Sequence, residues 1–139
     1  MSAGFENPPD DVVRAILAEP RVVAVVGCSP DATRDSHRIA ALLRDRGHRV
    51  IPVNPHCDEI FGTRCYPDLR SVPEPIELVD VFRRSSAVAA IVEDAIAIGA
   101  RIVWLQLGVI DAAAALRARA AGLTVVMDRC PAIEYRRLF

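Results

Sequence analysis

The sequence lacks the segments that carry a protein into or across a membrane. No run of apolar residues approaches the length of about eighteen that spans a bilayer. The first twenty residues contain Glu6, Asp10, Asp11 and Glu19 and have no apolar signal-peptide core. We therefore expect a cytoplasmic protein that has no membrane partner.

An excess of positive charge is also missing. The formal net charge is -1, whereas proteins that bind nucleic acid gather positive charge on one face. We therefore expect no nucleic-acid partner. Hydrophobic residues make up 52% of the 139 residues, which suffices for the core of one domain but not for a nucleotide domain with a separate catalytic domain. The expected organisation is a single domain over residues 1–139.

Cysteine motifs are absent as well. The four cysteines, at positions 28, 57, 65 and 130, form no C-x-x-C pair, so neither a disulfide framework nor a zinc ribbon is predicted. His56 and Cys57 with Cys65 match no common zinc-site spacing. We expect free thiols and no metal site.

What the sequence does contain is organised around residues 21–36. Five apolar residues from Val22 to Val26 predict the central strand of a parallel sheet covered on both faces. Gly27 ends this strand, and a glycine there permits a tight turn and the close approach of a ligand. A helix follows and closes at Gly47. The free N–H groups at the start of such a helix attract phosphate.

The loop after this strand does not complete a known nucleotide fingerprint. In the dinucleotide pattern G-x-G-x-x-G, only Gly27 is present, and Ser29 and Ala32 stand in place of the other glycines. No Gly-Lys-Ser/Thr is found, which excludes a P-loop. The loop alone is therefore compatible either with phosphate binding or with a tight connection that binds nothing.

The rest of the chain repeats the alternation of strand and helix. A first helix is predicted over about residues 8–19, and glycines close three later helices just before a strand. We predict an α/β fold with a single doubly wound parallel sheet, Rossmann-like, in the strand order 3-2-1-4-5-6, with its core over residues 20–138. The six predicted strands are residues 22–26, 49–54, 64–66, 77–82, 101–108 and 123–127.

Ligands of such sheets bind at the carboxyl ends of the strands. At the end of the second strand Asn54 stands where dinucleotide enzymes place a carboxylate for the ribose hydroxyls, and an amide does not repel a phosphorylated ribose. Arg34 and Arg83 offer forked donors for phosphate oxygens, although each alone is more typical of an exposed surface arginine. Together they favour a polyanionic ligand that carries adenine.

The sequence resembles the small bacterial CoA-binding proteins, whose domain is similar to the CoA-binding domain of succinyl-CoA synthetase and related acyl-CoA ligases. The resemblance covers nearly all of residues 20–138. It rests on five blocks in the same order, which are residues 25–30 with Arg34 and Ser36, 50–55, 79–83, 104–109 and 125–130.

The resemblance implies that coenzyme A is the bound ligand and that CoA or an acyl-CoA is the partner. The first loop and Arg34 would hold the phosphates, and the ends of the second and fourth predicted strands would flank the adenosine. The family pattern also includes Asp128, Arg129 and Cys130, to which we assign no contact. The implied cofactor-binding residues are Gly27, Cys28, Ser29, Arg34, Ser36, Asn54, Pro55, Phe82, Arg83 and Gly108.

No catalytic residue is expected. The ligases transfer a phosphoryl group through a histidine in a second domain. The neighbouring residues of that histidine are not found around His37, His48 or His56. We expect all three to be solvated or locally bonded. Cys28 would have a lowered pKa at a helix N-terminus and could form a mixed disulfide with CoA, or it is a small buried packing residue.

The leading hypothesis is a binding module that holds CoA or acyl-CoA without catalytic activity of its own. One alternative is an NADP-dependent oxidoreductase domain, which Asn54 permits but the missing glycines disfavour. Another is the CoA-binding subunit of a split acyl-CoA ligase, whose partner protein supplies the catalytic histidine. A homo-oligomer is also left open.

Overall fold

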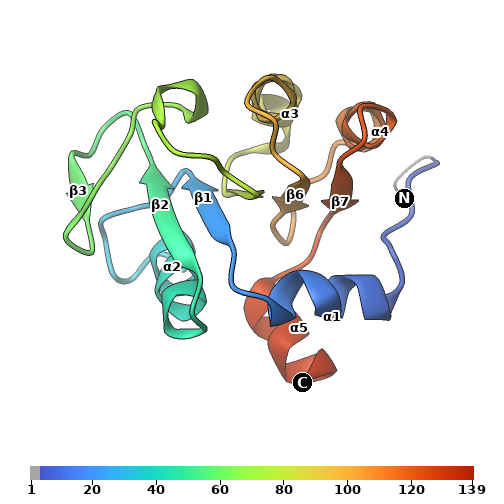
Figure 1. The fold of residues 1–139 in the computed structure, drawn as a ribbon, viewed down its shortest axis with the longest axis horizontal. Helices are drawn as coiled ribbons and strands as arrows, with labels where there is room; N and C mark the ends of the chain where they lie inside the picture. The colour runs from blue at the N-terminus through green and yellow to red at the C-terminus, as the bar shows by residue number, and fades with distance from the viewer. Residues whose placement is uncertain (1–3) are drawn as a thin grey trace.

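The computed structural model describes residues 4–139, and a parallel sheet of five strands lies at its centre (Figure 1). The strand order is β2-β1-β5-β6-β7, and every neighbouring pair is parallel. The predicted α/β class with a Rossmann-like parallel sheet is confirmed. The strands are β1 (Val22–Val26), β2 (Arg49–Val53), β5 (Leu78–Val81), β6 (Ile102–Leu105) and β7 (Thr124–Val126).

Helices cover both faces of this sheet (Figure 1). The helices α3 (Val88–Ala97) and α4 (Ala112–Ala120) lie on one face. The helices α1 (Asp10–Ala18), α2 (Asp35–Asp45) and α5 (Pro131–Leu138) lie on the other. The sequence did not predict α5, because its eight residues are too few for a clear apolar period. No helix of residues 4–139 is long and apolar enough to cross a membrane.

The predicted third strand at residues 64–66 is not a strand of the main sheet. Instead β3 (Glu59–Ile60) and β4 (Thr63–Arg64) form a small antiparallel ribbon. Within the described part of the chain, a single parallel bridge between Val53 and Tyr66 continues the sheet beyond β2. The predicted order of six strands is therefore corrected to five, because this turn-rich loop folds back on itself before it can extend along the edge. Residues 4–139 also contain two short 3-10 turns, η1 (Leu69–Ser71) and η2 (Ser85–Ala87).

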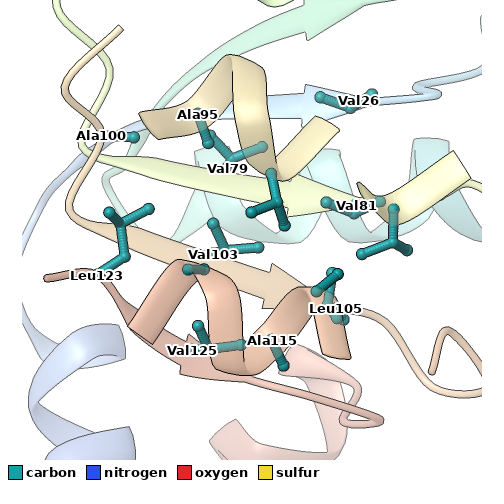
Figure 2. Close-up of a cluster of buried hydrophobic side chains, with 14 of the residues drawn as sticks. Val26, Val79, Val81, Ala95, Ala100, Val103, Leu105, Ala115, Leu123 and Val125 are labelled. Carbon is teal, nitrogen blue, oxygen red and sulfur yellow. The ribbon is translucent and has the colours of Figure 1, made fainter. Parts of the chain in front are cut away.

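The core forms two apolar layers, one on each side of the sheet. Alternate residues of each strand point to opposite faces, so one strand contributes to both layers. Figure 2 shows the layer beneath α3 and α4, where sheet valines such as Val79 and Val103 meet Ala95 and Ala115 of the helices. The small alanines let both helices approach the sheet closely. The other layer contains Trp104 and residues of α1, α2 and α5.

Candidate functional site

The carboxyl ends of the strands border a crevice made of two hollows that meet at Gly27. The larger hollow has a volume of about 450 Å³ and lies between the first turn of α2, the β6–α4 loop and the start of α5. The smaller has a volume of about 260 Å³ and lies on the side of α3. Of the predicted site residues, the larger hollow collects Gly27, Ser29, Arg34, Ser36 and Phe82, and the smaller collects Gly27, Pro55 and Arg83.

Gly27 is required by the packing of two turns against each other. Its φ is +86°, and a Cβ at this position would lie 2.3 Å from the carbonyl oxygen of Phe82. Its N–H donates to the carbonyl oxygen of Val53 at 2.8 Å. The glycine therefore permits the close approach of the β5 end, and its own N–H is engaged in the sheet bonding.

The β1–α2 loop is braced by short side chains and leaves the start of α2 open. The Ser29 N–H donates to Oγ of Ser36 at 2.9 Å, and Oγ of Ser29 accepts from the N–H of Asp31 at 3.0 Å. No side chain of residues 4–139 caps the N-terminus of α2. Its first N–H groups lack intrahelical partners and carry the positive end of the helix dipole at the rim of the larger hollow.

Two arginines at the crevice and a third next to them are exposed and have no ion pair with any residue of the described chain. Arg34 lines the larger hollow and Arg83 the smaller. Arg84 follows directly and was not assigned to the site from the sequence, although its place after a strand end was visible there. Arg38 also lines the larger hollow, but its guanidinium is paired with Asp35.

Asn54 has both ends of its amide engaged by the protein. Its Nδ2 donates to the carbonyl oxygen of Cys28 at 2.9 Å, and its Oδ1 accepts from the N–H of His56 at 2.8 Å. Asn54 thus fixes the glycine loop against the end of β2. This bracing accounts for an amide where dinucleotide enzymes have a carboxylate, because a carboxylate cannot donate to the Cys28 carbonyl.

The expectation of a lowered pKa for Cys28 is wrong. Its side chain is completely buried in the layer beneath the loop, and burial raises the pKa of the thiol to about 12. The alternative expectation, a small buried packing residue, is confirmed. Cys130 is the cysteine that lines the larger hollow.

Gly108 and Asp128 together shape the far rim of the crevice. The N–H of Gly108 donates to Oδ1 of Asp128 at 2.7 Å, and Asp128 holds a left-handed φ of +60°. Gly108 does not itself line the larger hollow, but its neighbours Leu107 and Val109 do. Arg129 contributes its carbonyl oxygen, which accepts from the Trp104 indole at 2.9 Å. Asp128 and Arg129 are therefore bracing residues of the loops around the crevice.

His48 lies away from the crevice and is locally bonded, as expected. Its Nδ1 accepts from the Arg21 N–H at 3.1 Å, and its Nε2 lies 2.8 Å from the Tyr135 hydroxyl. Burial lowers the pKa of this imidazole, which keeps it neutral. Among residues 4–139, no group of three or more His, Cys, Asp or Glu side chains could hold a metal ion.

The chain is similar in sequence to a small bacterial protein and to one section of an archaeal ligase. The chain is 34% identical over 126 residues to the uncharacterized protein YneT of Bacillus subtilis, which covers 91% of this chain and 93% of that protein. It is also 36% identical over 78 residues to an ADP-forming acetate–CoA ligase of Archaeoglobus fulgidus, which covers 56% of this chain but only 11% of the ligase.

A solved structure and a family model agree with this relationship. A hypothetical protein from Pyrococcus horikoshii superposes with a TM-score of 0.89 at 37% identity, over 96% of this chain and 98% of that one. The model of the CoA binding domain matches residues 21–136. The expected resemblance to the CoA-binding part of acyl-CoA ligases is confirmed, and the chain belongs to the CoA-binding domain family.

Proposed function

We propose that this protein binds coenzyme A or an acyl-CoA in the crevice and performs no chemistry of its own. The observation that carries the proposal is the meeting of two hollows at Gly27, each with an unpaired arginine at its edge. A ligand with phosphates in its middle and two unlike ends matches this layout. Membership of the CoA-binding domain family supports CoA as that ligand.

The diphosphate would lie at the start of α2. Its oxygens would accept from the uncapped N–H groups of the first turn and from the guanidinium of Arg34, which lines the same hollow. A charge-assisted hydrogen bond contributes about 1.5–3 kcal/mol, so this one arginine is worth about one to two decades of affinity.

The adenosine end would occupy the smaller hollow. Val53, Pro55, Leu69 and Ile91 give it apolar walls suited to a flat purine. Arg83 stands at its edge, where a phosphate on the ribose would accept from its forked donors. A ligand without this ribose phosphate, such as dephospho-CoA or NAD, would lose that interaction.

The role without chemistry follows from the sequence, in which neither His37 nor His56 nor His48 is flanked like the histidine that carries the phosphoryl group in the ligases. The four cysteines are free thiols, which fits a protein that works in the reducing cytoplasm.

Calorimetric titration of the purified protein with CoA, dephospho-CoA, NADP and NAD tests the proposal. We expect CoA to bind most tightly and dephospho-CoA about ten times more weakly, because one charge-assisted interaction is lost. Mass spectrometry of gently purified protein should also detect bound CoA species. Tighter binding of NADP or NAD than of CoA would favour the oxidoreductase alternative and contradict this one.

A second candidate, the CoA-binding subunit of a split acyl-CoA ligase, is favoured by the match to one section of the acetate–CoA ligase. In that case a larger chain should co-elute during purification from the native cell. The pair, but not this chain alone, should form acyl-CoA from a carboxylic acid, CoA and ATP. Ligase activity of the isolated chain would contradict both candidates.

A further inference from the structure

The larger hollow contains a buried polar side chain that the diphosphate does not explain. Gln106 follows β6 directly, is only 6% exposed and lines this hollow. Its Oε1 is buried and accepts no hydrogen bond from any described residue. Buried amide oxygens are almost always paired, so an unpaired one at a cavity wall indicates a missing donor.

The position of Gln106 is fixed by its backbone. Its N–H donates to the carbonyl oxygen of Val81 at 3.3 Å, and its carbonyl oxygen accepts from the N–H of Val109 at 2.8 Å. It comes two residues after Trp104, so its side chain points to the same face of the sheet, between α2 and α5. The backbone of Gln106 is therefore fixed at the wall of the hollow, while its side-chain oxygen bonds to no described residue.

The surroundings of Gln106 identify the class of group that it meets. Leu107 and Ile133, which are 60% and 42% exposed, form an apolar rim of the same hollow together with the buried Val109. The charged groups of this hollow, among them Arg34 and Asp35, come from the loop before α2 and the first turns of that helix, at the diphosphate end. A neutral, elongated group with amide N–H donors and apolar carbons fits the half around Gln106.

We propose that Gln106 recognises the pantetheine arm of CoA, with Oε1 accepting a hydrogen bond from one of the two amide N–H groups of that arm. This inference rests on the proposed function. It makes Gln106 a specificity residue, because it separates CoA from nucleotides that share the adenosine and phosphates but lack an amide arm. The apolar rim then accommodates the arm's methyl and methylene groups.

The test compares CoA with 3′-phosphoadenosine 5′-diphosphate, which is CoA without its arm. Gln106→Met keeps the length of the side chain and removes both polar atoms. We expect this variant to bind CoA about tenfold more weakly, or about 1.4 kcal/mol. Its affinity for the arm-less ligand should stay within about twofold of the wild type, because that ligand does not reach Gln106. Arg34→Ala serves as the matched contrast and should weaken both ligands equally.

A measurement on the wild type alone guards against misfolding of the variant. In two CoA analogues, one or the other amide N–H of the arm is replaced by an ester oxygen. We expect one analogue to bind about tenfold more weakly than CoA and the other to bind equally. Equal binding of CoA and both analogues would overturn the role of Gln106, as would equal weakening of CoA and the arm-less ligand by Gln106→Met. If the wild type bound neither CoA nor the arm-less ligand, the proposed function itself would fail and this inference with it.

Discussion

Arginine side chains are paired differently at the two ends of the parallel sheet. At the amino end, Arg21 is mostly buried and donates to Glu77 at 3.2 Å. At the carboxyl end, Arg34, Arg83 and Arg84 are exposed and pair with no carboxylate of residues 4–139. Arg21 thus joins elements of the fold, whereas the three arginines at the carboxyl end remain available to an anion.

An unpaired arginine becomes informative only when it adjoins a cavity. Arg101, just before β6 at the amino end, is exposed and also has no ion pair in the described chain. It lines neither of the two hollows of the crevice. Since solitary surface arginines are ordinary, the comparison depends on the joint presence of free charge and a hollow.

The largest effect is expected from Gly27→Ala, which tests the packing of the crevice end. A Cβ adds left-handed strain and a contact of 2.3 Å with the Phe82 carbonyl oxygen, so one of the two turns must move. We expect the free energy of unfolding to fall by about 3 kcal/mol and CoA affinity to fall with it. Urea unfolding and calorimetry measure the two losses.

Gly47→Ala is the matched control at the amino end. Gly47 has a similar φ of +93°, but a Cβ there would meet no atom within 4 Å. Gly47→Ala should lower the free energy of unfolding only by its backbone strain of about 1–2 kcal/mol and should not change CoA affinity. Equal destabilisation by the two substitutions would mean that the close approach at Gly27 has no special cost.

The next effect concerns the arginines themselves. Arg34→Ala and Arg83→Ala should each weaken CoA by about 1.5–3 kcal/mol, or about ten- to a hundredfold, because each removes a charge-assisted hydrogen bond. Arg101→Ala, which also removes an exposed charge, should leave affinity unchanged. Titration at two salt concentrations separates contact from long-range attraction, since only the latter is strongly screened. If all three variants bound CoA alike, the comparison between the two ends would have no functional meaning.

Much of the fold could be predicted because local sequence patterns agree with the burial and capping that the tertiary structure requires. The unbroken apolar run of β1 is buried on both faces, and Asp111 caps α4 by accepting from the Ala114 N–H at 3.0 Å. The failures have the opposite cause. Residues 64–66 look extended, but their partner is decided by how the preceding loop folds. The α5 helix depends on packing against α1 and α2 more than on its own sequence.

The candidate site was likewise predictable in its backbone positions but not in its side-chain orientations. Strand ends placed Gly27, Arg34 and Arg83 beside the crevice, since all carboxyl ends of a parallel sheet share one edge. Side-chain orientation was not predictable. The direction of Cys28 into the core and the engagement of the Asn54 amide both follow from three-dimensional neighbours.

Asp80 shows that the interior between the two ends is kept neutral. This residue of β5 is 1% exposed, and neither carboxyl oxygen has a hydrogen-bond partner among the described residues. Asp80 lines a small void in the interior, which the neutral imidazole of His48 also lines. Burial raises the pKa of Asp80 well above its usual value, because no cation offsets the desolvation. Asp80 is therefore protonated in the folded protein over a pH range in which the unfolded chain has already lost that proton.

The smallest effect is the pH dependence that this proton imposes. A raised folded-state pKa means that stability is fully present below the unfolded pKa of about 3.9 and is lost as pH rises toward the folded value. The unfolding free energy of the wild type, minus that of Asp80→Asn, should fall by about 1.4 kcal/mol per pH unit through this window. Urea unfolding of both proteins at pH 5, 6 and 7 measures the difference and cancels the opposite contribution of His48, whose lowered pKa favours higher pH. A difference that stays constant with pH would show that Asp80 is ionised in the folded state, and the interior of the sheet would then contain an unpaired charge.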